Sequence, residues 1–239
     1  MRCLLLAHST KATSDETRMT EFDFDTLKSD YDRDGFVVVP GYLSDPEVNE
    51  LRNRAFPLAS RLIAESDQGG RFRNLLKSLH RHDDWFNEQL NNGRHLPLIR
   101  HLLDGDVYGA SAAWFDRPEG ESQGVGPHVD ALGRDKYPDA GATIWFALDP
   151  VNVGNGCLHY LRGSHKNNYP DQIFIPEIDT DSDDAFAAEL EPGDAVIHHA
   201  LTVHWSGGNM SGMPRRAVSY FYFNARAQGT LRQRKRALS

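Results

Sequence analysis

The stretch Ala195-Val-Ile-His-His-Ala-Leu-Thr-Val-His204-Trp-Ser-Gly-Gly-Asn209 indicates both the fold and the chemistry of this chain. An apolar run typical of a β-strand leads to a second short strand that carries His204, and a glycine-rich turn follows. His198 and His199 are neighbours, so on a strand their side chains face opposite ways. At most one of them can share a face with His204, and we expect both to pack or to support a metal ligand rather than to be ligands.

Two more residues of metal-binding type lie in Pro127-His128-Val129-Asp130, where His128 precedes His204 by 76 positions. Side chains at positions i and i+2 of a strand point to the same face, so His128 and Asp130 could bind one ion while Val129 faces away. Alone, a His-x-Asp sequence is more typical of a surface turn than of a metal site. Together with His204 it forms a set of two imidazoles and one carboxylate, which leaves three positions of an octahedral iron open.

Composition and charge limit the classes of protein to which this chain can belong. Hydrophobic residues make up 39% and charged residues 25% of the 239 residues, so we expect a single globular domain over residues 21–239. The net charge of −8 argues against a nucleic-acid groove or an anionic membrane surface. No run approaches the ~20 apolar residues of a membrane helix. Two cysteines against eleven histidines indicate a reducing compartment, the cytoplasm, and metal chemistry through imidazole and carboxylate.

The two ends of the chain differ from the rest in composition. Residues 1–20 are largely polar and lack periodicity, and we expect them to form a disordered leader. From about residue 226 the chain is basic, which is typical of a solvated tail.

The first hundred residues are expected to be largely helical. A short amphipathic helix should end at Gly35, and residues 36–40 should form a strand. Ser44 and Glu47 form a capping box for a longer helix. We expect its buried face to carry Val48, Leu51, Ala55 and Leu58. Two further helical stretches are expected, one through Leu75, Leu76 and Leu79 and one from Leu96 to Leu103.

After Gly105 the pattern changes to short apolar runs separated by Gly, Pro, Asn and Asp. Such runs predict strands of a sandwich or barrel. They are Gly109 to Phe115, Thr143 to Leu148, Cys157 to Leu161, Ala195 to His199 and Ala217 to Phe223.

An ordered series of motifs over roughly residues 30–224 resembles the phytanoyl-CoA dioxygenase (PhyH)-like family of Fe(II)/2-oxoglutarate-dependent oxygenases. The series is Asp34-Gly-Phe-Val-Val-Val-Pro40, His128-Val-Asp130, Asn155-Gly-Cys-Leu158, Gly163-Ser-His165-Lys166, Pro192-Gly-Asp194, His204-Trp-Ser206-Gly-Gly-Asn209 and Arg215. One departure is Arg162, which stands where a proline usually precedes Gly-Ser-His.

The resemblance implies a role for each matched residue. His128, Asp130 and His204 would be the iron ligands. Arg215, eleven positions after His204, would hold the distal carboxylate of 2-oxoglutarate with the help of Ser206, because a planar guanidinium suits a carboxylate. Trp145 would line the cosubstrate pocket. Lys77 matches a basic residue that some members turn toward 2-oxoglutarate, although an exposed helix lysine is an equal alternative. Gly156 and Gly163 would form turns, and Ser164 and His165 would brace the site.

The resemblance also implies a fold and a reaction. The fold would be mainly β, a double-stranded β-helix (jelly roll, cupin-like) with the N-terminal helices packed on one sheet. The enzyme would be a dioxygenase that hydroxylates an unactivated C–H bond of a small molecule and converts 2-oxoglutarate and O2 to succinate and CO2. Related halogenases lack the carboxylate that Asp130 supplies here, which favours hydroxylation; desaturation or cyclisation on the same iron stays open.

The substrate is expected to contact loops beside the proposed triad. These are Trp114 to Gly126, Leu132 to Asp139 and Arg71 to His82, whose mixture of charges favours a polar or charged substrate. Two other protein classes remain as alternatives. A non-catalytic cupin-like binding module would need neither the full triad nor Arg215, and a zinc hydrolase would have no use for Arg215.

Overall fold

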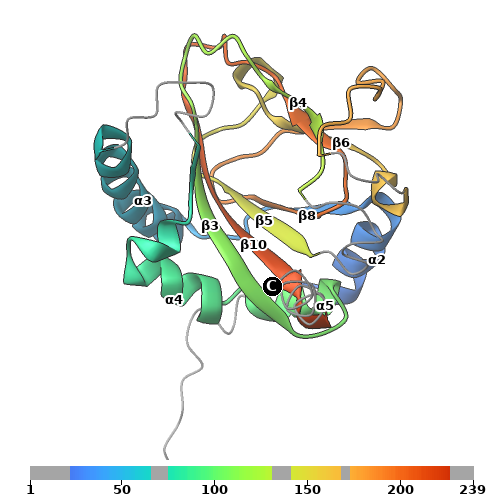
Figure 1. Cartoon of the computed structure of the whole chain (residues 1–239), viewed down its shortest axis with the longest axis horizontal. Coiled ribbons are helices and arrows are strands. Elements are labelled where there is room, and N and C mark those ends of the chain that lie inside the picture. Colours follow the sequence, from blue (N-terminus) through green and yellow to red (C-terminus); the bar gives the residue numbers. More distant parts are fainter. Residues whose placement is uncertain (1–21, 66–74, 131–140, 168–172, 227–239) are drawn as a thin grey trace, which may run out of the picture.

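The computed structural model describes residues 22–65, 75–130, 141–167 and 173–226 (Figure 1). The predicted leader and almost all of the predicted basic tail lie outside these ranges. The helices are α2 (Phe24–Asp34), α3 (Asp45–Glu65), α4 (Asp84–Asn92) and α5 (Leu96–Leu102), with the 3-10 turns η1 (Leu79–Arg81), η2 (Val153–Asn155) and η3 (Ser164–Lys166). Within the described ranges, no helix has both the length and the apolar character needed to cross a membrane.

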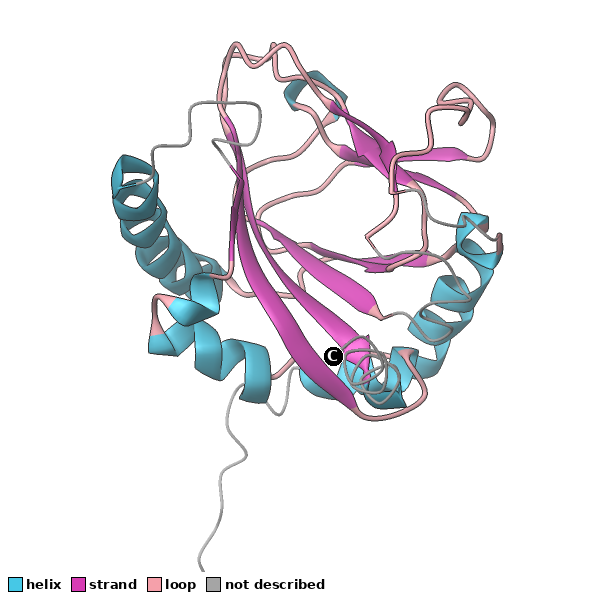
Figure 2. Ribbon diagram, in the orientation of Figure 1, coloured by secondary structure: helices cyan, strands magenta, loops and turns pink. Residues whose placement is uncertain are grey.

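Two antiparallel sheets face each other (Figure 2). The larger has the strand order β1-β8-β5-β10-β3-β2 and the smaller β4-β9-β6-β7. The strands are β1 (Phe36–Val39), β2 (Leu75–Lys77), β3 (Val107–Arg117), β4 (Val125–His128), β5 (Ala142–Ala147), β6 (Leu158–Leu161), β7 (Ala185–Ala188), β8 (Ala195–His199), β9 (His204–Ser206) and β10 (Arg215–Asn224). Two facing antiparallel sheets with the helices on one side form the predicted jelly roll.

The two faces of the larger sheet bury different residues because side chains alternate along each strand. Trp114, Ile144 and Val218 belong to a core shared with the helices. Trp145 and Ala217, one position away, belong to a second core between the sheets. Figure 1 shows α3 and α4 on the opposite side of β3 and β10 from β4 and β6. The helices therefore cover the outer face and leave the inner face for a site.

The predicted N-terminal elements are largely confirmed. Helix α2 begins after Asp23, whose carboxylate accepts from two backbone N–H groups, and ends at Gly35 in the left-handed conformation with φ 86°. Helix α3 begins after Ser44, whose backbone N–H donates to the Glu47 carboxylate at 2.6 Å as the capping box predicts. Its buried residues include the four apolar positions expected from the sequence.

One predicted helix is wrong. Leu75 to Lys77 form strand β2, which pairs with β3 at the edge of the larger sheet, and Leu79 begins the 3-10 turn η1. So short an apolar run fits either structure, and the pairing of Leu75 and Leu76 with Phe115 and Trp114 decides in favour of the strand. Helix α4 and strand β7 were not predicted.

Candidate active site

The smaller sheet brings the two candidate histidines together. In the antiparallel pairing of β4 with β9, His128 lies directly opposite His204, and the centroids of their rings are 4.1 Å apart. Asp130 follows two positions after His128. One candidate ligand atom from each of the three residues lies within 4.8 Å of the other two. The structure thus joins the predicted triad, while Val129 is fully buried in a separate apolar cluster as predicted.

Both histidines present Nε2 to the shared space. Nδ1 of His128 lies 2.9 Å from the Gly126 carbonyl, and Nδ1 of His204 lies 3.0 Å from the Thr202 carbonyl. A ring nitrogen that donates to a carbonyl leaves the other nitrogen with its lone pair free. Burial lowers the pKa of His128 and of His204, so both rings favour the neutral form that binds metals.

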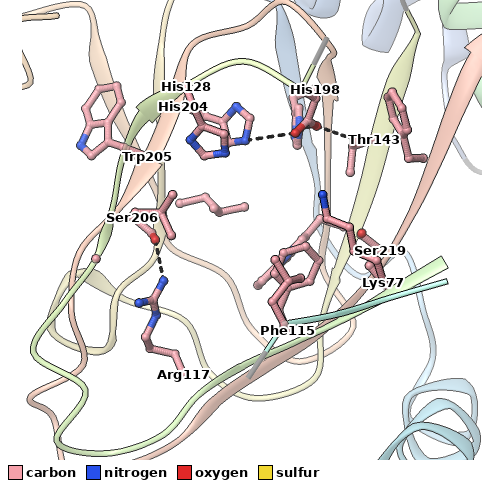
Figure 3. A pocket seen from close by; sticks show the side chains of 18 of the residues that line it. Lys77, Phe115, Arg117, His128, Thr143, His198, His204, Trp205, Ser206 and Ser219 are labelled. Carbon is pink, nitrogen blue, oxygen red and sulfur yellow. Dashed lines mark hydrogen bonds and ion pairs between the residues drawn. The ribbon is translucent and has the colours of Figure 1, made fainter. Parts of the chain in front are cut away.

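Asp130 is held by its backbone and by one carboxylate oxygen. Its N–H donates to the Ala200 carbonyl at 2.9 Å. Oδ2 accepts from the Thr143 hydroxyl at 2.8 Å, an interaction that a dashed line marks in Figure 3, and lies 3.0 Å from His198 Nε2. Oδ1 faces His204, 3.8 Å from its Nε2. Burial opposes ionisation of this carboxyl, but the His198 hydrogen bond and the neighbouring His204 ring hold its pKa below the ordinary value.

The paired histidines of β8 have separate roles. His198 contacts Asp130 and points toward the cavity, in agreement with the supporting role expected from the sequence. His199 packs its ring between those of Tyr31 and His165, away from the triad.

Arg215 is the buried cation of the site. The residue is 3% exposed, and its Nη2 donates to the Gly156 carbonyl at 2.9 Å. Its Nε has no hydrogen-bond partner among the described residues, and its guanidinium lies 5.6 Å from the centre of the Trp145 ring. Burial, followed by repulsion from Arg117, lowers the pKa of Arg215 to about 10. A buried guanidinium with a free donor is suited to a carboxylate ligand.

Arg117 is a candidate binding residue that the sequence analysis included only within the stretch Trp114 to Gly126 and did not single out. It lies opposite Arg215 in the pairing of β3 with β10, and its Nη2 donates to the Ser206 hydroxyl at 2.9 Å. Two guanidinium groups and one hydroxyl therefore meet at one end of the cavity. The alternation along β3 was the available signal, because Arg117 shares the inward face of Ala113 and Phe115.

A single cavity of about 440 Å³ contains the whole predicted constellation. Its lining includes all seven residues singled out from the sequence: Lys77, His128, Asp130, Trp145, His204, Ser206 and Arg215. Figure 3 shows the Lys77 ammonium pointing into the cavity between the sheets. No ion pair or hydrogen bond of the Lys77 ammonium is found in the described part of the chain.

The loops predicted to contact substrate are only partly present at the cavity. Phe115, Glu121 and Gln123 line it, but Trp114 faces the helices and is 3% exposed. Residues 132–139 and 71–74 lie outside the described residues. Ile173 and Phe174, which the sequence reading did not single out, also line the cavity.

Two predicted turns support the site. Gly156 adopts φ 82°, and a Cβ there would lie 2.7 Å from the Gly207 carbonyl, so only glycine lets this carbonyl reach Arg215. In the second turn, the Ser164 hydroxyl donates to the Leu161 carbonyl and accepts from the N–H of Val203, next to His204. The unusual Arg162 beside Gly163 donates to Asp34 at 2.7 Å.

Comparisons with known proteins show which family the sequence of this chain matches. The family model for phytanoyl-CoA dioxygenase (PhyH) matches residues 31–217. Over 104 residues the chain is 33% identical to phytanoyl-CoA dioxygenase 1 of Oryza sativa subsp. japonica, covering 40% of this chain and 37% of that protein. It is 28% identical over 163 residues to phytanoyl-CoA dioxygenase domain-containing protein 1 of Mus musculus, covering 62% and 56%. The matched segments thus span less than two thirds of these relatives.

Solved structures are similar over more of their length. The epimerase SnoN, in complex with Fe3+, alpha ketoglutarate and nogalamycin RO, superposes with a TM-score of 0.69 at 26% identity and covers 84% of each chain. EctD from S. alaskensis, solved with 2-oxoglutarate and 5-hydroxyectoine, gives a TM-score of 0.71 at 19% identity, covering 91% of this chain and 79% of EctD. At that identity the likeness to EctD shows the fold alone.

Proposed function

Because this chain belongs to the phytanoyl-CoA dioxygenase family, we propose that it is an Fe(II)- and 2-oxoglutarate-dependent dioxygenase. It hydroxylates an unactivated C–H bond of a small-molecule metabolite and converts 2-oxoglutarate and O2 to succinate and CO2. The observation that carries the proposal is one cavity that holds a two-histidine, one-carboxylate cluster together with the buried, incompletely paired Arg215.

The donor set fits a ferrous ion. Two neutral imidazoles and one carboxylate, with their ligand atoms within 4.8 Å of one another, match the facial arrangement of non-haem iron sites. His128, Asp130 and His204 would hold the metal and leave three positions open. Zinc sites of the hydrolytic type also need a general base beside the metal, and their chemistry does not use a buried arginine.

The opposite end of the cavity fits the distal carboxylate of 2-oxoglutarate. Arg215 would bind it with the donors that the protein leaves unpaired, and the Ser206 hydroxyl, fixed by Arg117, would contribute a further hydrogen bond. Trp145 forms the wall beside Arg215. Lys77 would attract the negative charge of the cosubstrate from the β2 edge.

When bound, the iron and 2-oxoglutarate supply the oxidising chemistry. The chain's own part is to orient and to exclude water. The apolar side chains of Phe115 and Phe221 wall the cavity between the sheets, and Phe174 packs beside His128 with ring centres 5.9 Å apart. They would place a substrate C–H bond near the metal and keep bulk water away from it.

A binding experiment followed by a turnover experiment tests the proposal. Anaerobic addition of Fe(II) and 2-oxoglutarate should give the weak visible charge-transfer band of a chelated keto acid. In air, a metabolite screen scored by succinate release should identify substrates. The variants His128→Ala and Asp130→Ala should lose both signals, and full turnover by both would overturn the assignment. Binding of both ligands without succinate release on any metabolite would favour a cupin-like binding module, and activity with Zn(II) alone would favour a hydrolase.

The product distinguishes the outcomes of the reaction. A gain of one oxygen atom indicates hydroxylation, a loss of two hydrogens indicates desaturation or ring closure, and an unchanged mass indicates epimerisation. The last two matter because the similar structures include the epimerase SnoN and the carbocyclase SnoK.

The cavity, the net charge and the cysteines bear on the partners and the location of the protein. A small-molecule substrate fits the volume of the cavity. The net charge of −8 supports a role away from nucleic acids and anionic membranes. The free, buried thiol of Cys157 supports a reducing compartment such as the cytoplasm.

A further inference from the structure

We propose that His198, together with Thr143, is a positioning residue that restricts Asp130 to binding the metal through a single oxygen. This inference rests on the proposed function, because it assigns a role toward the metal that Asp130 would hold. It adds a residue that neither the triad nor the cosubstrate end of the site includes.

The contacts divide the two oxygens of the Asp130 carboxylate. Oδ2 accepts from the Thr143 hydroxyl at 2.8 Å and from His198 Nε2 at 3.0 Å. Oδ1 is directed toward His204, at 3.8 Å from its Nε2. With two donors on Oδ2, the lone pairs of that oxygen are used by the protein, and Oδ1 remains for an ion.

A buried tyrosine sets the orientation of His198. The Tyr160 hydroxyl lies 3.1 Å from His198 Nδ1, and the two rings are 5.3 Å apart. A hydroxyl that donates to Nδ1 places the ring proton on Nε2, which is the nitrogen that faces Asp130. The His198 side chain is 3% exposed, so the ring cannot turn to solvent. Tyr160, His198 and Asp130 thus form a continuous chain of hydrogen bonds that ends at the metal site.

Binding of Asp130 through one oxygen determines how many coordination positions of the metal stay open. Two histidines and one carboxylate oxygen leave three positions of an octahedral ion, enough for a bidentate keto acid and one further ligand. A carboxylate bound through both oxygens would occupy one of them. His198 and Thr143 therefore keep open the position that the reaction needs, besides orienting the ligand.

The experiment compares a variant without the donor and a variant that restores it. His198→Leu removes the Nε2–H group that donates to Asp130. The side-chain amide of His198→Gln can place an N–H at a similar distance from the backbone. Each purified apo-protein is titrated anaerobically with Fe(II), and the charge-transfer band is then recorded with saturating 2-oxoglutarate. We expect His198→Leu to weaken Fe(II) binding roughly 10- to 100-fold and to shift the band, and His198→Gln to recover most of both.

Circular dichroism and thermal unfolding check that each variant is folded. If His198→Leu does not fold, Thr143→Val tests the same oxygen from β5, with Thr143→Ser as its matched control. Folded His198→Leu with wild-type Fe(II) affinity and an unchanged band would overturn the inference, as would a glutamine variant no better than leucine. Failure of the wild-type protein to bind Fe(II) would instead overturn the proposed function.

Discussion

The guanidinium of Arg117 donates to the hydroxyl of Ser206 at 2.9 Å and so connects β3 of the larger sheet with β9 of the smaller one. Because this hydroxyl faces the end of the cavity where Arg215 lies, we expect Arg117→Met to raise the Kd for 2-oxoglutarate about tenfold, as loss of one charge-assisted hydrogen bond would. Isothermal titration calorimetry on the Fe(II) protein measures it. Arg61→Met, which removes the same charge from the surface of α3, is the control and should leave Kd unchanged.

Arg215 should matter more than Arg117 because it is fully enclosed. Arg215→Met removes the buried donors, and we expect 2-oxoglutarate affinity to fall by at least about 100-fold, equivalent to roughly 3 kcal/mol. Arg215→Lys should recover little, since a point charge cannot hold Gly156 and a carboxylate in the same planar geometry. Retention of wild-type affinity by the methionine variant, measured in the same titration, would exclude this end of the cavity as the cosubstrate site.

Lys77 offers a test of a side chain that the fold does not need. Its ammonium has no hydrogen bond or ion pair in the described part of the chain, and its backbone pairing with Ala113 does not depend on the side chain, so Lys77→Met should leave the melting temperature unchanged. If its charge attracts 2-oxoglutarate, Kd should rise about three- to tenfold, and the effect should shrink at high salt. An unchanged Kd at low salt would assign Lys77 to the alternative of a solvent-exposed lysine.

Asp34 should stabilise the fold in a pH-dependent manner. Arg33 and Arg162 both donate to its carboxylate, and the hydrogen bond from Arg33 is the main reason that its pKa is lowered. A lowered pKa gives stability above the unfolded value of about 3.9 that is lost as the pH falls through the folded value. Asp34→Asn should therefore reduce the free energy of unfolding at pH 7 by about 1–2 kcal/mol.

The pH series provides the control for this prediction. Urea unfolding at pH 7, 5 and 3 should show the difference between Asp34→Asn and wild type shrinking toward pH 3. A difference that stays constant across the series would mean that the asparagine acts through packing rather than through lost charge.

His95 should also make the protein sensitive to acid, because the fold disfavours its charged form. It is buried against Tyr220 and Tyr222, and burial lowers its pKa to about 3. Between pH 6.5 and pH 3 the unfolded chain binds a proton that the folded chain does not, so stability falls as the pH falls. This single group costs roughly 2–3 kcal/mol between pH 6.5 and 4.

The prediction for His95 is tested by removing its titratable ring and measuring unfolding as a function of pH. His95→Phe should flatten the pH dependence of unfolding in this range, and the Tyr222 hydroxyl keeps its hydrogen bond to the Leu90 carbonyl. A pH slope equal to that of the wild type would show that other groups govern acid sensitivity.

Local pattern was enough to predict much of the fold and of the candidate site. His128, Asp130 and His204 stand in short motifs whose residue types restrict the chemistry, Arg215 followed from the family resemblance, and the structure gathers all four around one cavity. The helix ends at Gly35 and Ser44 follow capping rules that act within a few residues.

The features that were not predicted, or were predicted wrongly, depend on pairing between distant segments. Arg117 is a candidate binding residue because it lies opposite Arg215, which is ninety-eight positions later in the chain. The link from Tyr160 to His198 joins two different sheets. Leu75 becomes a strand residue because an edge of β3 is available to it. Alternation along β3 places Arg117 on the inward face, but neither periodicity nor composition gives its partner on the neighbouring strand, since register between strands is a tertiary property.

The direct pairing of His128 with His204 also bears on the stability of the smaller sheet. Strand β4 is short and lies at the edge of the smaller sheet, with β9 as its neighbour. An ion shared by these two histidines and Asp130 would fasten that edge and close a long segment of chain containing β5 to β8, the kind of loop for which a clip offsets most entropy. Without the ion, β4 would be held to β9 by strand pairing alone, and its detachment would expose the edge of β9 to other chains.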